Sequence, residues 1–224
     1  MIANFTELRR KMVDNQIRTV DVTDLSVLEA FLSVPREDFV LEDSKGLSYF
    51  DLDVVVSPKQ SGVSERCLMK PAALAKLLQL SAVKSSDVVL NIGANVGYCA
   101  ALLSRIAKSV IALESDKSLS QRAAKILRDH QCSNVLVVCG ALEKGYTVKA
   151  PYDLVFIEGA VDFIPKDIFD QMKEGGRLVV VKGHGNAGVA QIYVKEDAGI
   201  SVRRDFNLSV KPVPGFLKEP CFVF

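Results

Sequence analysis

The 224-residue sequence has no tryptophan, two histidines, and five cysteines with no C-x-x-C pair among them. An odd number of widely spaced cysteines supports neither a disulfide framework nor a structural zinc site. Cys99 and Cys139 lie in apolar runs and are predicted to be small core residues, and this cysteine usage fits a reducing, cytoplasmic location. His130 and His184 are far apart in the sequence, so we expect surface residues and no bound metal.

Long apolar runs and a surplus of charge of one sign are also missing. No stretch approaches the roughly 20 apolar residues that cross a bilayer, and residues 1–7 lack the features of a signal peptide. The formal net charge is +1 and the basic residues are scattered, so neither a membrane nor a nucleic-acid partner is predicted. The length suits one domain over residues 1–224. Residues 1–80 would be a helical, substrate-side segment and residues 81–224 a cofactor-binding α/β core, with the oligomeric state left open.

One stretch carries a clear chemical pattern, the segment VVLNIGANVGY at residues 88–98. A β-branched apolar run enters a loop of glycines and small polar residues, and the loop opens into a helical pattern. Gly93 and Gly97 allow a tight turn and a close approach to a ligand, while the helix N-terminus presents free N–H groups. A second apolar run delivers Glu114 about 20 residues later, where a carboxylate can accept hydrogen bonds from a ribose. The pattern predicts a site for a nucleoside-bearing cofactor, and a plain strand-to-helix turn is the alternative.

The spacing of this loop separates two kinds of cofactor. Dinucleotide sites use G-x-G-x-x-G, whose middle glycine makes room for a pyrophosphate. Here the loop reads G-x-N-x-G, with Asn95 in the middle and one residue fewer before Gly97. This spacing disfavours an NAD-dependent dehydrogenase. It resembles motif I of the class I S-adenosylmethionine methyltransferases, whose loop wraps the methionine part of the cofactor.

The rest of the chain alternates between strand and helix patterns. Five strands are expected, at 87–92, 109–114, 134–139, 153–158 and 176–182. Three helices are expected between them, at 98–107, 117–130 and 164–173. Near-continuous apolar strands separated by helices indicate a parallel sheet buried on both faces.

Both ends of the chain add to this core. Residues 5–38 have helical spacing, Pro71 is typical of a helix start, and residues 41–64 are predicted to be a loop or a short strand pair. Residues 191–194 and 201–210 could complete the sheet as a hairpin. The apolar tail from residue 212 onward is predicted to pack on the sheet.

Several segments occur in a characteristic order: MVDNQIR at 12–18, VLEA at 27–30, VPREDFV at 34–40, motif I, APYD at 150–153 and MKEGGRLV at 172–179. Together they resemble the protein-L-isoaspartate O-methyltransferase family over about residues 10–183. The resemblance implies a class I methyltransferase fold, with a Rossmann-like, doubly wound, mostly parallel sheet and an N-terminal helical extension. It implies a carboxyl methyltransferase that uses S-adenosyl-L-methionine on isoaspartyl residues of damaged proteins. It also implies the cofactor-binding residues Asn91, Gly93, Ala94, Asn95, Gly97, Glu114, Ser115, Ala141 and Leu142.

The chain departs from the family in the segment that would hold the acceptor carboxylate. The family pattern there resembles G-Q-T-I-S-Q-P, and this chain has ERCLMKP at residues 65–71. Cys67 takes the threonine position and Met69 the serine position, so both hydroxyl donors are lost. No catalytic residue is therefore assigned, and Ser64 is a candidate substitute. Simple apolar packing is the alternative explanation of Met69.

Other departures concern replacement donors and the cofactor. Arg66 and Lys70 are candidates to bind a carboxylate by charge. Motif I begins with Asn91 in place of the usual acid, and Ala141 stands where the family has an adenine-binding acid. Losing one hydrogen bond costs on the order of 1 kcal/mol, so cofactor binding is expected to be weakened and not abolished.

These departures leave the function partly open. Glu158 ends the fourth predicted strand and is either a residue that lines the acceptor site or a solvated strand end. Isoaspartyl methylation is the leading prediction. The changes at Met69 and Ala141 keep two alternatives: methylation of another substrate, and cofactor binding without isoaspartyl activity.

Overall fold

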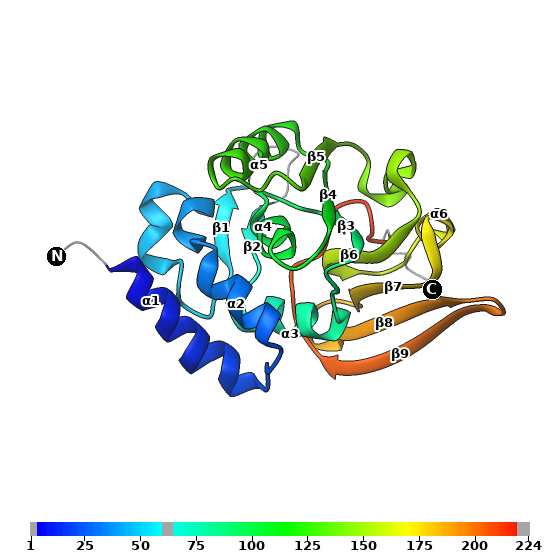
Figure 1. Cartoon of the computed structure of the whole chain (residues 1–224), viewed down its shortest axis with the longest axis horizontal. Helices are drawn as coiled ribbons and strands as arrows, with labels where there is room; N and C mark the ends of the chain where they lie inside the picture. Colours follow the sequence, from blue (N-terminus) through cyan, green and yellow to red (C-terminus); the bar gives the residue numbers. More distant parts are fainter. Residues whose placement is uncertain (1–3, 60–64, 219–224) are drawn as a thin grey trace, which may run out of the picture.

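The computed structural model describes residues 4–59 and 65–218. Its centre is a seven-stranded sheet in the order β5-β4-β3-β6-β7-β8-β9 (Figure 1). Strands β3 to β7 run parallel, and β8 and β9 extend the sheet antiparallel. The strands are β3 Val88–Ile92, β4 Ser109–Glu114, β5 Val135–Cys139, β6 Tyr152–Val161, β7 Met172–Lys182, β8 Val189–Glu196 and β9 Gly199–Asn207. The predicted fold class is confirmed, and the strand order reverses between β3 and β6, where open α/β sheets bind ligands.

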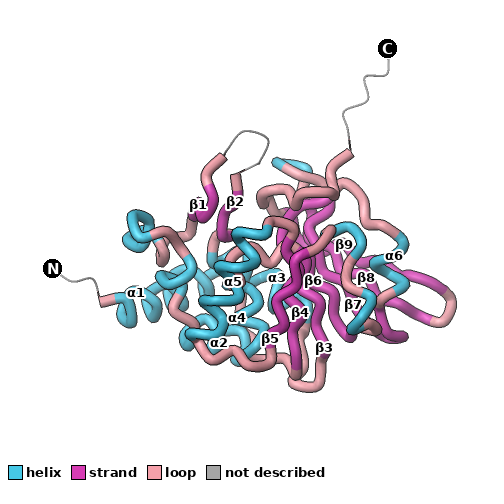
Figure 2. Tube along the Cα trace, turned by 90° about the horizontal axis from the view of Figure 1, so that it is seen from above, coloured by secondary structure: helices cyan, strands magenta, loops and turns pink. Residues whose placement is uncertain are grey.

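Helices cover both faces of the parallel strands. Figure 2 shows α3, α4 and α5 with the N-terminal helices on one side of the sheet and α6 on the other. These helices are α3 Pro71–Ser81, α4 Tyr98–Ser104, α5 Lys117–Asp129 and α6 Lys166–Asp170. The central strands β3 and β6 are accordingly buried along most of their length, as expected for strands covered on both faces.

The N-terminal extension is helical, as predicted, but it is interrupted. It consists of α1 Phe5–Met12, a π-helical turn Val13–Ile17, a 3₁₀ turn Arg18–Val20 and α2 Leu25–Ser33. Asp24 caps the N-terminus of α2, because its carboxylate accepts hydrogen bonds from the N–H groups of Ser26 and Val27. The helix ends two residues before Pro35, which cannot continue it.

A small second sheet lies between this extension and α3. Strand β1 (Val54–Ser57) pairs antiparallel with β2 (Arg66–Leu68). A short strand pair was one of two predictions for residues 41–64, and β1 lies in that range while its partner follows just after it. Two 3₁₀ helices, η3 (Arg36–Phe39) and η4 (Glu42–Leu47), precede it. Ser64, the candidate donor, lies outside the described residues.

Three details of the prediction were wrong. The helix expected at 164–173 is reduced to α6, because the buried Met172 already pairs in the sheet as the first residue of β7. Strand β6 does not end at Glu158 but continues to Val161. Cys139 is exposed and not in the core, because β5 is the edge strand of the sheet.

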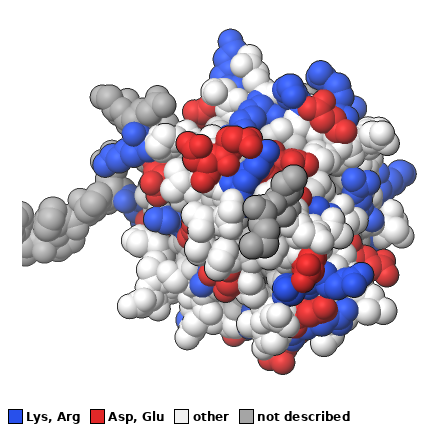
Figure 3. All heavy atoms as spheres, turned by 90° about the vertical axis from the view of Figure 1, so that its left-hand side faces the viewer, with Lys and Arg blue, Asp and Glu red and all other residues white. Residues whose placement is uncertain are grey.

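The C-terminal tail and the surface complete the description. Val213 and Phe216 are buried and Pro212 pairs with Ala160 of β6, so the predicted packing of the tail on the sheet is confirmed for residues 212–216. On the face drawn in Figure 3, acidic and basic side chains are intermixed. In residues 4–59 and 65–218, no helix has the length and apolar character needed to span a membrane.

Candidate active site

The predicted cofactor loop joins β3 to α4 at the carboxyl end of the parallel strands. Gly93 has a φ of 80° and Gly97 a φ of 90°, a region that favours glycine. A Cβ on Gly97 would lie 2.9 Å from the side chain of Leu127. The N–H groups of Gly93 and Ala94 both donate to the carbonyl of Leu113, so the loop is held against β4.

Glu114, the acid expected to bind a ribose, is fully buried at the end of β4. Its carboxylate accepts hydrogen bonds from the backbone N–H groups of Asn95 (2.7 Å), Ser115 (2.8 Å) and Asp116 (3.0 Å). Arg66 of β2 adds two parallel N–H···O bonds of 2.9 and 2.8 Å. A planar guanidinium that meets both carboxylate oxygens in this way makes a strong pair.

Glu114 is the predicted ribose acceptor, and its ion pair with Arg66 already occupies it. A carboxylate offers about four lone-pair sites, and the backbone and guanidinium donors already use both oxygens of Glu114. Arg66 was a candidate to bind the carboxylate of a substrate, and it binds a carboxylate of the protein itself. Its guanidinium has to leave Glu114 before ribose hydroxyls can take its place.

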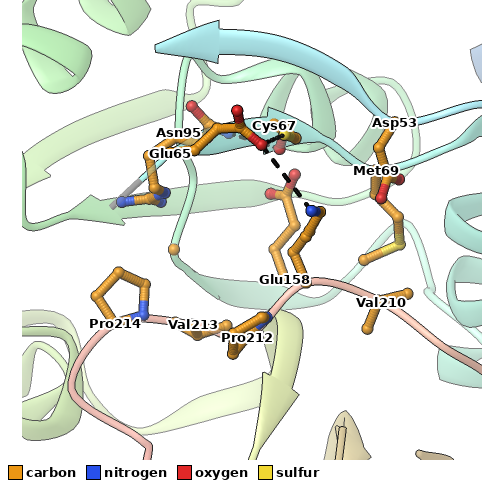
Figure 4. Close-up of a pocket in the computed structure, with 13 residues that line it drawn as sticks. Asp53, Glu65, Cys67, Met69, Asn95, Glu158, Val210, Pro212, Val213 and Pro214 are labelled. Atoms are coloured by element: carbon orange, nitrogen blue, oxygen red, sulfur yellow. Dashed lines mark hydrogen bonds and ion pairs between the residues drawn. The ribbon is translucent and has the colours of Figure 1, made fainter. Parts of the chain in front are cut away.

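A pocket opens beside the loop, between β2, β6 and the C-terminal segment, residues 210–214 (Figure 4). Its volume is about 460 Å³ including the part open to solvent, and Arg66 forms part of its wall while paired with Glu114. Its walls are Asp53, Glu65, Arg66, Cys67, Met69, Gly93, Asn95, Glu158, Val210, Lys211, Pro212, Val213 and Pro214.

Glu158 lines this pocket as a half-buried side chain, so it is not a fully solvated strand end. Its Oε2 accepts a hydrogen bond of 3.4 Å from the side-chain amide of Asn91 in β3. Burial raises the pKa of Glu158 to about 8, against the opposing effects of the Asn91 hydrogen bond and the charge of Arg66. A carboxyl group with this pKa is mostly protonated at pH 7, so it is a neutral group that can donate a hydrogen bond.

The wall that contains Met69 is supported from behind by a buried cation. Arg36 of η3 is fully buried, and its Nη2 donates to the carbonyl oxygen of Met69 at 3.0 Å. Its guanidinium lies 4.8 Å from the ring centre of Tyr98, within the range of a cation–π contact. Leu68 and Met69 are themselves buried, which agrees with apolar packing as the role of Met69.

Two buried acceptors near the loop fit a bound cofactor. Oδ1 of Asn91 and Oδ1 of Asn95 have no hydrogen-bond partner within the part of the chain that the structure describes. Buried acceptors are usually paired, so both suit the ammonium and hydroxyl donors of S-adenosylmethionine. The loop thus fits the expected cofactor, while the ribose position fits it once Arg66 has left Glu114.

The residues predicted to bind the cofactor lie around the loop, but only some reach the pocket. Gly93 and Asn95 line it, and Asn91 reaches it through Glu158. The others do not line it: Ala94 and Gly97 are buried within the loop, Leu142 is buried, and Ser115 and Ala141 are exposed.

Other functional features were not predicted or lie elsewhere. The segment Val210–Pro214 covers one side of the pocket, and its two prolines, which rigidify a chain, were the only sequence signal for it. His184 is exposed as predicted, whereas His130 is only partly exposed and pairs with Asp38. Among residues 4–59 and 65–218, no group of three or more metal-binding side chains is present.

Comparison with known proteins places this geometry in a family. The family model described as Protein-L-isoaspartate(D-aspartate) O-methyltransferase (PCMT) matches residues 7–215. A protein-L-isoaspartate O-methyltransferase of Desulfotalea psychrophila is 34% identical over 196 residues, which cover 88% of this chain and 89% of the relative. Protein-L-isoaspartate O-methyltransferase 1 of Pelobacter propionicus is 32% identical, with 95% of this chain and 98% of the relative covered.

Solved structures agree with the family match. A protein-L-isoaspartate O-methyltransferase superposes with a TM-score of 0.82 at 26% identity, over 92% of this chain and 66% of that chain. A putative protein-L-isoaspartate O-methyltransferase from Plasmodium falciparum, solved in complex with S-adenosyl-L-homocysteine, has the same fold, with a TM-score of 0.75 at 18% identity. The chain belongs to the protein-L-isoaspartate(D-aspartate) O-methyltransferase family of S-adenosylmethionine-dependent methyltransferases.

Proposed function

We propose that this chain methylates the free side carboxylate of L-isoaspartyl residues in damaged proteins, with S-adenosylmethionine as the methyl donor. The observation that carries the proposal is the pocket in which motif I, at Gly93 and Asn95, meets the acceptor segment at Met69. The family match over residues 7–215 supports the same reaction. We assign cofactor binding to the loop from Asn91 to Gly97 and to Glu114, with Ser115, Ala141 and Leu142 at the edge of the site.

The reaction asks for orientation more than for acid–base chemistry. When bound, the cofactor would supply a methyl group attached to a positively charged sulfur. A carboxylate oxygen would bond to the methyl carbon as the bond between methyl and sulfur breaks. An isoaspartyl carboxylate is already ionised near neutral pH, so it needs no general base. Correct alignment of two reacting groups can contribute roughly 7–11 kcal/mol to lowering the barrier.

The residues of the pocket meet this requirement with a partly apolar channel. Met69, Val210 and Val213 supply apolar walls, and the prolines at 212 and 214 fix the course of the covering segment. Apolar walls of this kind favour the exclusion of water from bound reactants. The role that we assign to the chain itself is therefore to bind, to align and to exclude water.

The direct test is methyl transfer to a synthetic peptide that contains one L-isoaspartyl residue, measured as S-adenosylhomocysteine formed. The same peptide with an ordinary aspartyl residue is the matched control. We expect transfer to the isoaspartyl peptide alone. Equal rates with both peptides, or no transfer at high enzyme concentration, would reject the proposal.

A second candidate is methylation of a different acceptor, which the altered segment favours. Met69 and Cys67 offer no hydroxyl donor, and the acids Asp53, Glu65 and Glu158 line the same pocket. Incubating the chain with labelled S-adenosylmethionine and a cell extract would reveal such an acceptor. Label in a small molecule, or in a protein without isoaspartyl residues, would favour this candidate over the first if the isoaspartyl peptide stays unlabelled.

A further inference from the structure

A carboxylate acceptor in the pocket needs a hydrogen-bond donor, and the side-chain donors there are largely engaged. Arg66 is held by its ion pair with Glu114 in this structure, and once ribose displaces it, it becomes a rival donor for the acceptor. The amide of Asn95 donates to the carbonyl oxygen of Cys67 at 2.9 Å, and the thiol of Cys67 donates to Glu65 at 3.5 Å. Lys211 lies 3.9 Å from the same Glu65 carboxylate. Met69, in the serine position, has no donor at all.

In this pocket, one carboxyl oxygen of Glu158 is available to a ligand. Its Oε2 accepts from Asn91, while its Oε1 has no hydrogen-bond partner within residues 4–59 and 65–218. Figure 4 shows the side chain reaching from β6 into the middle of the pocket, between the segment with Cys67 and Met69 and the segment with Pro212. A proton on Oε1 would therefore point at a ligand in the pocket, because Oε2 already serves as an acceptor.

The surroundings of Glu158 favour its neutral form. Burial has the largest effect and raises its pKa to about 8; the nearby negative charge of Glu114 acts in the same direction, and Asn91, Arg66 and Arg36 oppose it. The charged or titratable groups around it come from several neighbouring elements: Arg36 of η3, Asp53, Glu65, Arg66 and Cys67 of β2, Cys99 of α4, Glu114 of β4 and Lys211 of the C-terminal segment.

We propose that Glu158, as a neutral carboxylic acid, donates a hydrogen bond to the acceptor carboxylate and takes over the role of the missing hydroxyl donors. The proposal rests on the proposed function and names the residue that binds the acceptor. Glu158 keeps its proton throughout: the methyl–sulfur bond breaks, the methyl–oxygen bond forms, and the sulfur retains the electron pair. Ionised Glu158 would instead repel the acceptor, so binding of an anionic acceptor falls as pH rises.

The test is the pH profile of kcat/KM for the isoaspartyl peptide, from pH 6 to 9.5 at saturating S-adenosylmethionine. Wild type is expected to lose activity as pH rises through about 8. Glu158→Gln keeps an N–H donor that does not titrate, so it should retain activity and lose this descending limb. Glu158→Ala removes the donor and should lower kcat/KM about 10- to 100-fold at pH 7, chiefly through KM. Adding Met69→Ser to Glu158→Ala restores a hydroxyl and should recover part of that loss.

Two measurements separate this proposal from its rivals. Thermal unfolding and the Kd for S-adenosylhomocysteine show whether each variant is folded with an intact cofactor site. Lys211→Gln and Arg66→Gln test the two rival cations of the pocket: loss of methyl transfer in either variant, with active Glu158→Ala, would overturn the proposal. A descending limb that persists in Glu158→Gln, or a wild-type rate that rises with pH as for a general base, would also overturn it. A wild type that does not methylate the isoaspartyl peptide would overturn the proposed function together with this inference. An active wild type whose Glu158 variants do not show the expected activities and pH profiles would overturn this inference alone.

Discussion

At the scale of single residues, Arg66 changes the electrostatics of the cofactor site most. Glu114 is fully buried, and Arg66 is the one side chain that neutralises its charge among the residues described. Breaking a buried ion pair by removing one partner is costly, because it leaves a charge without compensation. Here the backbone donors of Asn95, Ser115 and Asp116 would remain and reduce that cost. Arg66 is thus both a support for the apo site and a competitor of the ribose.

Replacing Arg66 with Gln should separate these two effects. The free energy of unfolding should fall by about 1–3 kcal/mol, because one partner of a partly hydrogen-bonded buried pair is lost. The Kd for S-adenosylmethionine should fall about tenfold, since the ribose no longer has to displace a guanidinium. Chemical denaturation and isothermal calorimetry measure the two quantities.

The control for this prediction is Arg203→Gln, because Arg203 is exposed on β9 and pairs with Asp205, far from Glu114 in the sequence. It should change neither the unfolding free energy nor the Kd appreciably. Weaker cofactor binding by Arg66→Gln would contradict the competition argument and would instead show that Arg66 holds the cofactor.

Glu158 should make the stability of the fold depend on pH in a defined direction. Its pKa is raised from 4.5 to about 8 in the folded state, so between these values the folded chain binds the proton that the unfolded chain has released. Stability therefore falls as pH rises from about 4.5 to 8, and the penalty is complete above 8. Relative to Glu158→Gln, wild type should lose about 2 to 4 kcal/mol across this range, because pocket water screens part of the shift. Chemical denaturation at several pH values measures this. A difference in unfolding free energy between the two proteins that stays constant from pH 4.5 to 8 would contradict the prediction.

At the scale of elements, local patterns predicted the core well. Each of five core elements has a single, uninterrupted pattern of apolar residues and lies within a few residues of its predicted range. These elements are the strands β3, β4 and β5 and the helices α4 and α5. The region around Met172 was not predictable in this way, because its residues lack a clear helical or alternating period. There, pairing with β6 decides the structure, and this is a tertiary effect that overrides local propensity.

The end of α3 offers a test of helix capping. Ala82 follows the helix with φ 44° and ψ 53°, the left-handed conformation in which glycine is preferred, and its side chain is exposed. Ala82→Gly should raise the free energy of unfolding by about 0.5–1 kcal/mol, because it relieves the clash of Cβ with the backbone. Ala124→Gly, within α5, is the matched control and should lower it by about the same amount. A loss of stability in Ala82→Gly would contradict the capping argument.

At the scale of the whole molecule, the site is closed by segments that are far apart in the sequence. Arg66 and Glu114 are separated by 48 positions, and residues 210–214 return from beyond β9 to cover Gly93 and Glu158. The motif I loop could be found from its sequence because its glycines, strand and helix are adjacent. The Arg66–Glu114 pair and the raised pKa of Glu158 could not, because both arise only when segments distant in the sequence come together.

The packing of the C-terminal segment on β6 depends on Gly159. Its φ is 151°, and a Cβ there would lie 2.7 Å from both the carbonyl oxygen of Lys211 and the side chain of Val213. Gly159→Ala should therefore push this segment away and lower the free energy of unfolding by about 1–3 kcal/mol. Since Val213 also lies against Gly93, the Kd for S-adenosylmethionine should rise in the same variant. Gly46→Ala, at a glycine with open space around it, is the control and should stay within about 0.5 kcal/mol of wild type; equal effects of the two substitutions would show that the segment does not depend on close packing at β6.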